Sequence, residues 1–303
     1  MARLARLTTV SWSPRLEEDD ILGGNRRQAC EMIDRAAQDG SDLICMPEIF
    51  AQRHFPFEEA VEHAEPVPGP TTEAIGEACR RNNCYAIATT VEEDGGKLYN
   101  TAALVGRDGE LVGKYRKMRP TIGEIEAGVT PGTETPVFET DFGRVGMAIC
   151  FDMNFLDVGQ GLYENEAQVI CWPSMYQAGR QLQFWALQFG CYVVSSWGGQ
   201  LNWVVDMTGE VLATTGYQYP IITVEVNFDR EVLHQDQNRE KWDAIREKYG
   251  AGVEIRIAHP EGIFTLASNM DDVTVPDIIE EFELETRRDY YARANAVRHA
   301  AVH

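Results

Sequence analysis

The sequence predicts an α/β protein in which two β-sheets pack face to face and helices cover their outer faces. Both halves of the chain, residues 3–117 and 137–228, alternate short apolar segments typical of buried strands with amphipathic helical segments. Both halves also contain a hairpin signal, at residues 107–109 and 208–209. No linker, low-complexity segment or change in composition separates the halves, so we predict one domain.

The first half begins with a β-α-β unit. Residues 3–12 alternate loosely and predict a strand, and residues 43–46 predict a second strand that ends at Pro47 and Glu48. Residues 25–38 between them predict a helix, because their apolar side chains fall on one face. These apolar residues are Ala29, Met32, Ile33 and Ala36.

The remaining segments follow the same logic. Apolar runs bounded by glycine, proline or Asp-Gly predict strands, and runs with a spacing of three to four residues predict helices. In the first half these are a helix at 70–82 and strands at 84–93, 97–106 and 110–117, followed by a glycine- and proline-rich loop at 117–132 and a return to a strand that ends at Cys150. In the second half they are helices at 158–166 and 179–190 and strands at 167–173, 191–197, 203–215 (a hairpin) and 219–228.

The character of the chain changes after Asn227. Residues 228–250 and 276–299 are charged and predict helices without a strand-rich core. We therefore assign residues 1–227 to the core and 228–303 to a C-terminal helical tail of the same domain. The tail carries too many large apolar side chains to leave exposed to solvent. This favours a tail that reaches across a two-fold dimer interface in a homo-oligomer. The alternative is a tail that packs on its own domain. These groups are Ile278, Ile279, Phe282, Leu284, Tyr290 and Tyr291.

Composition excludes several classes of partner. The formal net charge of −21 argues against nucleic acid and against anionic membrane surfaces. Residues 181–205 carry no charged side chain and are numerous enough to span a bilayer, but they are too polar to do so. Seven cysteines without a paired motif, six scattered histidines and no leader pattern predict a cytoplasmic protein without a metal or cofactor.

Three residues have the chemistry needed to cleave a carbon–nitrogen bond through a covalent intermediate. Cys150 ends an apolar run in VGMAICFDMN and would be the nucleophile, Glu48 would be its base, and Lys117 in KYRKMRP would stabilise the oxyanion. Each residue also has an ordinary interpretation. A cysteine in an apolar run is usually inert, a glutamate after a strand is usually solvated, and a lysine among other cations usually belongs to a basic surface.

The stretches DLICMPEIF, KYRKMRP and GMAICFDMNF, in this order, resemble the nitrilase superfamily of carbon–nitrogen hydrolases. The similarity continues through CWPSMYQ and VVDMTGEVLA, so it covers about residues 4–227. The resemblance implies a nitrilase-like four-layer α-β-β-α sandwich and a Glu-Lys-Cys triad at Glu48, Lys117 and Cys150. It also implies a second glutamate beside the site, for which Glu124 matches best and Glu126 is the nearby competitor.

Three departures from the family pattern qualify what the resemblance implies. Phe151 and Asp152 follow the cysteine where nitrilases usually have tryptophan and glutamate, which favours an amide or carbamoyl substrate over a nitrile. Gln188 stands where relatives commonly have a glutamate, and Met118-Arg119 replaces the usual basic or histidine position. None of these changes removes a member of the triad.

The leading prediction is an amidase or N-carbamoyl amidohydrolase that acts on a small linear substrate through a thioester. Lys117 and the backbone N–H of Phe151 would hold the oxyanion. The alternatives are a nitrilase, an acyl transferase that uses an amine acceptor, and a binding or scaffold protein that keeps the fold without the chemistry. Loops near the site would select the substrate, and their candidate contact residues are Arg53, His54, Met153, Asn154, Met175, Tyr176 and Arg180.

Overall fold

A computed structural model describes residues 3–258 and 260–302. The described chain divides into two compact units. Of the described residues, 5–226 form the larger unit, and 227–258 and 260–302 together with residues 3 and 4 form the smaller one. Each unit has its own hydrophobic core, and each is described by itself below.

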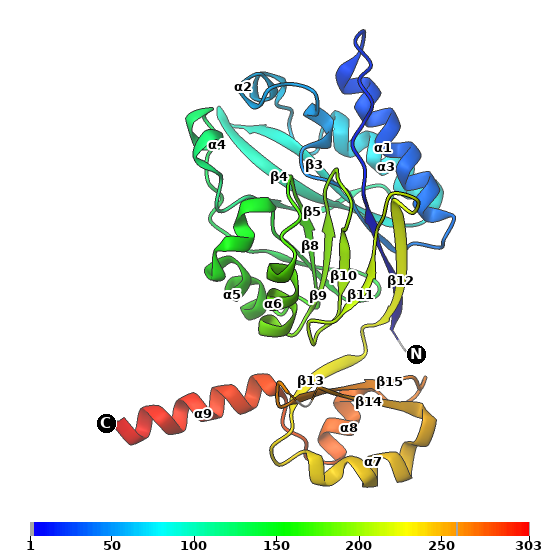
Figure 1. The fold of residues 1–303 in the computed structure, drawn as a ribbon, viewed down its shortest axis with the longest axis vertical. Helices are drawn as coiled ribbons and strands as arrows, with labels where there is room; N and C mark the ends of the chain where they lie inside the picture. Colours follow the sequence, from blue (N-terminus) through cyan, green and yellow to red (C-terminus); the bar gives the residue numbers. More distant parts are fainter. Residues whose placement is uncertain (1–2, 259, 303) are drawn as a thin grey trace. The chain divides into compact units, whose positions relative to one another are not determined.

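The larger unit contains two six-stranded sheets with helices between their strands (Figure 1). Its longer helices follow the expected apolar spacing, and α1 begins where the Asp20 side chain accepts a hydrogen bond from the Gly23 N–H at 2.9 Å. The elements in chain order are β1 (Leu4–Val10), α1 (Ile21–Ala37), β2 (Leu43–Cys45), η1 (Phe50–Gln52), α2 (Phe57–Ala60), η2 (Val61–His63), α3 (Pro70–Asn82), β3 (Tyr85–Asp94), β4 (Lys97–Val105), β5 (Leu111–Arg116), α4 (Ile122–Glu126), β6 (Val137–Glu139), β7 (Arg144–Met147), η3 (Cys150–Asn154), α5 (Leu156–Glu164), β8 (Val169–Pro173), α6 (Arg180–Phe189), β9 (Tyr192–Ser196), β10 (Trp203–Val205), β11 (Val211–Thr214) and β12 (Ile221–Asn227).

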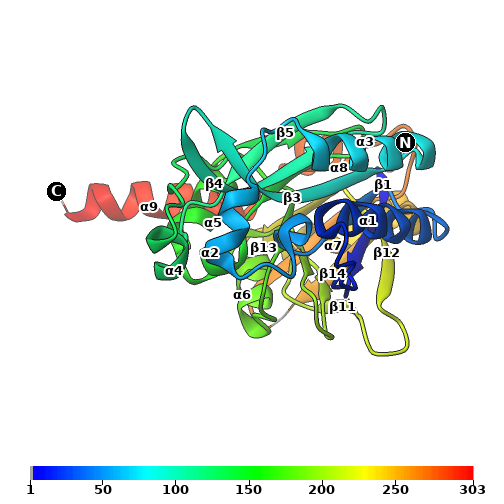
Figure 2. The same cartoon turned by 90° about the horizontal axis from the view of Figure 1, so that it is seen from above.

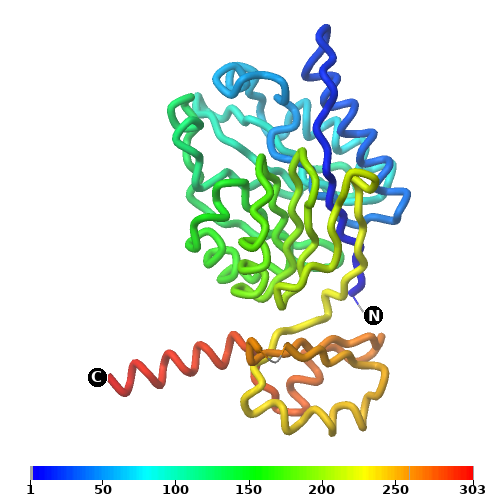
Figure 3. The backbone as a smooth tube through the Cα atoms, in the orientation of Figure 1, coloured from blue at the N-terminus to red at the C-terminus, as the bar shows by residue number. Residues whose placement is uncertain are grey.

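Each half of the chain forms one sheet, with one exception in the strand order. The first sheet has the order β12-β1-β2-β3-β4-β5 and the second has the order β11-β10-β9-β8-β7-β6. The last strand, β12, therefore leaves the half of the chain that precedes it and pairs beside β1, as the chain trace shows (Figure 3). The centre of each sheet is parallel, through β1-β2-β3 and β7-β8-β9, and hairpins add the antiparallel edges.

The four-layer α-β-β-α arrangement is confirmed. Helices α1 and α3 pack on the first sheet (Figure 2). Ile33 and Ile75 are fully buried there with residues of β2 and β3. Helices α5 and α6 belong to the second sheet, and they approach so closely that a Cβ on Gly159 would lie 2.1 Å from the ring of Phe189. The two sheets are joined at the ends of β9 and β1, where the Ser196 hydroxyl donates to the Val10 carbonyl at 2.7 Å.

The smaller unit corrects the prediction of a purely helical tail. Three strands form an antiparallel sheet of order β13-β15-β14, and helices α7 and α8 pack on it. The misleading feature is composition, because both outer strands of this sheet carry charged residues. Strand β14 (VEIRIA) alternates apolar and charged residues as a strand with one solvated face does, whereas β13 (REVLH) shows no such alternation. The elements are β13 (Arg230–His234), η4 (Arg239–Lys241), α7 (Trp242–Tyr249), η5 (Gly250–Gly252), β14 (Val253–Ala258), β15 (Ile263–Ser268), α8 (Val275–Glu281) and α9 (Arg287–Val302).

The apolar groups that suggested an intersubunit tail are largely covered within this smaller unit. Ile278 and Leu284 are buried in its core, and Ile279 and Phe282 pack against it. Tyr290 stacks on His234 with ring centroids 4.4 Å apart. The apolar residues of α8 therefore need no second subunit to cover them, whereas most of α9 is exposed.

Candidate active site

Glu48, Lys117 and Glu124 meet in one buried cluster although they come from three separate segments. Glu48 follows β2, Lys117 follows β5, and Glu124 lies in the short helix α4. The Lys117 ammonium is 2.9 Å from Glu48 Oε1 and 2.8 Å from Glu124 Oε2. All three residues are at most 5% exposed, so the cation is surrounded by carboxylates rather than by water.

The position of Glu124 is fixed by the sequence around it. Thr121 caps α4 by accepting from the Glu124 N–H, and Glu124 Oε2 in turn accepts from the Thr121 N–H at 2.6 Å. This reciprocal capping box needs Thr and Glu three residues apart. It turns the Glu124 carboxylate toward Lys117, whereas Glu126 is exposed. The structure thus places Glu124, not Glu126, in the cluster.

Mutual charge keeps Lys117 and Glu124 ionised. Burial alone would lower the pKa of Lys117, but the negative charges of Glu48 and Glu124 outweigh it and leave that pKa above its ordinary value. Burial raises the pKa of Glu124, and the charge and hydrogen bonds of Lys117 more than reverse this, so the pKa is lowered. At neutral pH Lys117 is therefore an ammonium and Glu124 a carboxylate.

Asn100 is a member of the cluster that the sequence reasoning missed. Its side-chain N–H groups donate to Glu48 Oε1 at 2.8 Å and to Glu124 Oε1 at 2.7 Å. The Lys117 backbone N–H donates to the Asn100 carbonyl at 2.9 Å, which places the two residues side by side. An asparagine in an otherwise apolar, fully buried segment of β4 was the signal that could have identified it.

Replacing Asn100 with leucine is expected to destabilise the protein by about 2 kcal/mol, because two hydrogen bonds to buried carboxylates are lost. Urea unfolding at pH 7 measures this change. Asn82→Leu is the matched control, since the Asn82 amide also bonds a carboxylate, that of Asp34, but at a half-exposed position. Equal losses in the two variants would contradict a special role for Asn100.

Cys150 lies in the first turn after β7, not at the end of the strand itself. Strand β7 ends at Met147, and Cys150 begins the 3-10 turn η3 with a positive φ of 47°. A non-glycine residue in this region is strained by about 1–3 kcal/mol and must be held by its surroundings. The indole N–H of Trp172 provides one restraint by donating to the Cys150 carbonyl at 3.0 Å.

The charges of the cluster shift the pKa of the Cys150 thiol. Burial and the negative charge of Glu48 raise its pKa to about 12, while Lys117 acts in the opposite direction. The Met175 backbone N–H and the Ser174 hydroxyl hydrogen-bond to the sulfur and also favour the thiolate. Ser174, which follows β8, is a second residue that the sequence reasoning missed.

One oxygen of Glu48 is available for chemistry. Oε1 accepts from Lys117 and Asn100, whereas Oε2 is buried without a hydrogen-bond partner among the described residues. Buried carboxylate oxygens are normally hydrogen-bonded, so an unpartnered one beside a thiol is a candidate proton acceptor.

The predicted substrate contacts separate into two groups. Asn154 and Tyr176 lie together near Cys150 in a hydrogen-bonded ring that Gln181 completes, with the Gln181 amide donating to Asn154 Oδ1 at 2.8 Å. Burial and the charge of Cys150 raise the pKa of Tyr176 to about 12, which places its hydroxyl in the same electrostatic environment. Gln181 was not predicted.

The other predicted contacts have different surroundings. Arg53 places a guanidinium N–H 3.1 Å from the sulfur of Met175, the residue whose backbone N–H bonds the Cys150 thiol. The His54 ring bonds the Pro14 carbonyl at 2.7 Å, a contact that fixes the backbone of its loop. Met153 is 2% exposed, and Arg180 is exposed at the beginning of α6.

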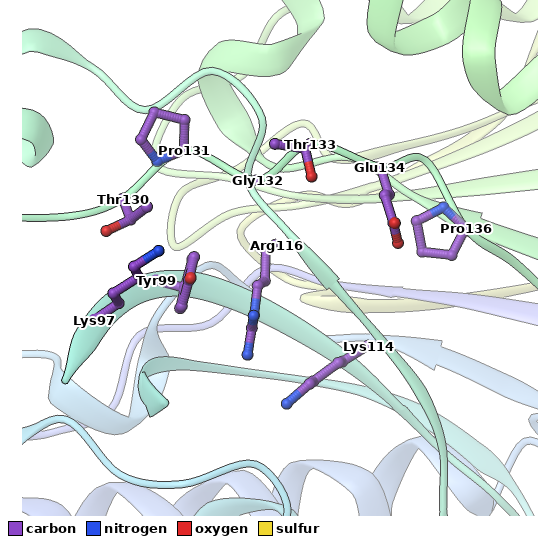
Figure 4. Close-up of a pocket in the computed structure, with 10 residues that line it drawn as sticks. All are labelled: Lys97, Tyr99, Lys114, Arg116, Thr130, Pro131, Gly132, Thr133, Glu134 and Pro136. Atoms are coloured by element: carbon purple, nitrogen blue, oxygen red, sulfur yellow. The ribbon is translucent and has the colours of Figure 1, made fainter. Parts of the chain in front are cut away.

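A separate cavity of about 530 Å³ lies between β4, β5 and the loop of residues 130–136 (Figure 4). It contains none of the clustered residues. Two of its three cations, Lys114 and Arg116, are paired with the buried Glu92, and Arg116 also stacks 3.8 Å above the centroid of the Tyr99 ring. These charges are used within the protein, so this cavity is not the candidate active site.

Comparison with known proteins agrees with the geometry. A family model described as carbon-nitrogen hydrolase matches residues 22–232. Omega-amidase NIT2 of Xenopus tropicalis is 30% identical over 241 residues, which cover 69% of this chain and 85% of that protein. Omega-amidase NIT2 of Homo sapiens is 29% identical over 247 residues, which cover 71% and 87%.

Solved structures show the same fold. Nit3 of Saccharomyces cerevisiae, a member of branch 10 of the nitrilase superfamily, matches with a TM-score of 0.65 at 20% identity over 82% of this chain and 94% of that one. An amidase from Nesterenkonia sp. matches with a TM-score of 0.63 at 19% identity over 74% and 90%. None of the helices that the structure describes is long and apolar enough to cross a membrane. The predicted family is thus confirmed, and the chain belongs to the carbon–nitrogen hydrolase family of the nitrilase superfamily.

Proposed function

We propose that the protein is an amidase in which Cys150 attacks the carbonyl carbon of a small linear amide. The observation that carries this proposal is the buried Lys117 ammonium held between Glu48 and Glu124 next to the Cys150 thiol. Amide hydrolysis through a thioester needs a nucleophile, a base and a cation at the developing oxyanion. Glu48 and Lys117 supply a base and a cation in one buried cluster, and the charges of both act on the pKa of the Cys150 thiol.

In the first half of the reaction, Glu48 Oε2 takes the proton of Cys150 as the sulfur bonds to the amide carbon. The raised pKa of the thiol, about 12, means that the thiolate exists only when a base accepts this proton during attack. The Lys117 ammonium and the Phe151 backbone N–H hold the oxyanion. The carbon–nitrogen bond then breaks, and Glu48 returns the proton to the leaving ammonia or amine.

In the second half, water replaces the leaving group. Glu48 removes a proton from the water as its oxygen attacks the thioester carbon. The carbon–sulfur bond breaks, the carboxylic acid leaves, and the proton returns to Cys150. Glu124 does not exchange protons in this scheme, because its lowered pKa keeps it ionised, and its task is to hold the Lys117 ammonium. The chemistry requires no cofactor.

Three substrate classes share this mechanism and are separated by their products. A primary amide yields a carboxylic acid and ammonia, an N-carbamoyl amine yields the free amine, carbon dioxide and ammonia, and a nitrile gives the same acid as its amide without a free amide. We favour the amide because the relatives above are amidases and because Phe151-Asp152 replaces the usual Trp-Glu pair of nitrilases. The decisive test is ammonia release from matched amide, N-carbamoyl and nitrile substrates. Turnover of the nitrile alone would favour the nitrilase, and no turnover of any class would favour a binding protein.

We also propose that the protein forms homo-oligomers built from two-fold dimers, in a reducing compartment such as the cytoplasm. All seven cysteines are free thiols, which suits such a compartment. Helix α9 supports the assembly, because it exposes Tyr291, Val297 and Val302 at 46%, 63% and 67% along a helix that is mostly uncovered.

Removing α9 by truncation after Thr286 is therefore expected to reduce the oligomer. Light scattering at micromolar concentration gives the mass of the full chain and of the truncated chain. A full-length monomer would refute the assembly, and an unchanged mass after truncation would place the interface elsewhere. Near-ultraviolet circular dichroism of the truncated chain is the control for folding, since α9 contributes little to the core of the smaller unit.

A further inference from the structure

Asp152 is a fully buried carboxylate that receives hydrogen bonds from three residues in two segments of the chain. The Ile149 N–H donates to its Oδ2 at 2.8 Å, the Arg119 N–H donates to its Oδ1 at 2.8 Å, and the Tyr115 hydroxyl donates to Oδ2 at 2.7 Å. Burial raises the pKa of Asp152 to about 6, so the group is still an ionised acceptor at neutral pH. Burying such a charge costs desolvation free energy unless hydrogen-bond partners compensate for the lost water.

One of the three donors is the sequence neighbour of Cys150, and the other two lie close to Lys117 in the sequence. Ile149 directly precedes Cys150 and enters the strained turn of the second sheet. Tyr115 and Arg119 each lie two residues from Lys117, in β5 of the first sheet and in the loop that leads to α4. The Tyr115 hydroxyl also accepts from the Met118 N–H at 3.2 Å. The Asp152 carboxylate therefore joins the segment that carries the thiol to the segment that carries the ammonium.

We infer that Asp152 is a positioning residue that sets the distance between the Cys150 sulfur and the Lys117 ammonium by bonding the backbone on both sides. The inference rests on the proposed function for its effect on turnover. Asp152 itself exchanges no proton with the substrate, because its oxygens are occupied by the three donors. A carboxylate suits this task because it only accepts hydrogen bonds, whereas an amide would turn N–H groups toward at least one donor.

Two variants test this role, each with a matched control. Asp152→Asn replaces one accepting oxygen with a donating NH2 group. Tyr115→Phe removes a single donor while keeping the ring. Asp206→Asn is the control for the first, since Asp206 is also buried and accepts from the Thr208 and Glu210 N–H groups in the turn between β10 and β11. Tyr85→Phe is the control for the second, because the Tyr85 contacts with Phe142 and Arg107 involve its ring.

A displacement of about 1 Å between reacting groups can cost about 100-fold in rate. We expect Asp152→Asn to lower kcat by roughly that factor and Tyr115→Phe by roughly tenfold, both with KM nearly unchanged. The rate of Cys150 alkylation by iodoacetamide, measured by intact mass, should also fall, and more in Asp152→Asn than in Tyr115→Phe. Both controls should keep the wild-type kcat and alkylation rate even where they are less stable.

Tyr115→Phe keeps the test decisive if Asp152→Asn does not fold. A wild-type kcat and alkylation rate in folded Tyr115→Phe would overturn the inference, as would equal losses in the Asp206→Asn control. The two readouts also separate this inference from the proposed function. If the wild-type protein hydrolyses no amide, the proposed function fails, while slower alkylation in Asp152→Asn and Tyr115→Phe than in their controls still supports the positioning role.

Discussion

Replacing Cys150 with alanine is expected to abolish amide hydrolysis while the protein stays folded. The loss should be on the order of 10⁴-fold or more in kcat, because removing the nucleophile disables both halves of the reaction. Stability should change by only about 1 kcal/mol, since a single small buried group is removed. Ammonia release measures the activity, and thermal unfolding together with near-ultraviolet circular dichroism measures the fold.

The matched control for this variant is Cys30→Ala. Cys30 is the least buried of the seven free cysteines, so it is the thiol most open to reagents, yet it lies in α1 and bonds the Ala74 carbonyl. Intact-mass analysis during turnover should find an acyl adduct on the wild type and on Cys30→Ala but not on Cys150→Ala. Substantial turnover by Cys150→Ala would refute the thioester mechanism.

Local patterns predicted most of the larger unit, because its strands and helices have consistent periodicity and clear boundaries. The Asp-Gly hairpin between β4 and β5 and the apolar face of α1 are examples in which neighbouring residues decide the structure. Strand β12 is different. Its pairing beside β1 depends on residues more than 200 positions away, such as the contact between Thr8 and Thr223, and no local pattern reports it.

Two parts of the site show the same division. The choice between Glu124 and Glu126 was available in the sequence, because Thr121 and Glu124 have the spacing of a capping box and Glu126 does not. Asn100 and Ser174 were not identified, because their importance arises only when separate strands bring them against Glu48, Glu124 and Cys150. A polar residue in an apolar strand signals a buried partner without saying which one.

The smaller unit was the main error, and its cause is physical. Strand β14 alternates apolar and charged residues, as expected for a strand with one solvated face. Strand β13 (REVLH) has no such alternation and leads into a charged helical segment, so its composition favours a helix. Strand β15 is buried along its whole length, and its apolar run IFTLAS was the better signal.

Replacing Lys117 with methionine is expected to lower kcat by about 10³-fold, because the cation that faces the oxyanion is lost while a side chain of similar length remains. Lys114→Met is the matched control, since Lys114 lies in β5 just before Lys117 and also pairs with a buried carboxylate, that of Glu92. The control should keep most of its activity. A Lys117→Met enzyme with near wild-type kcat would exclude Lys117 from oxyanion stabilisation.

The same substitution should also destabilise the protein, in a way that depends on pH. Removing Lys117 leaves Glu48 and Glu124 buried next to each other without a cation, which costs about 3–5 kcal/mol at pH 7. In the wild type the lowered pKa of Glu124 gives stability that is present above pH 4.5 and is lost as the pH falls through the folded-state value. The raised pKa of Lys117 gives stability that is present below pH 10.5 and is lost only at more alkaline pH.

In Lys117→Met the sign for Glu124 reverses. Burial and the neighbouring Glu48 now raise its pKa above the unfolded value, so the folded state binds a proton more readily than the unfolded state, and acid favours folding. The deficit in unfolding free energy relative to the wild type should therefore shrink between pH 7 and pH 5. Urea unfolding of both proteins across this range measures it. A deficit that stays constant with pH would mean that Lys117 contributes packing alone, and the cluster would then not be held by charge.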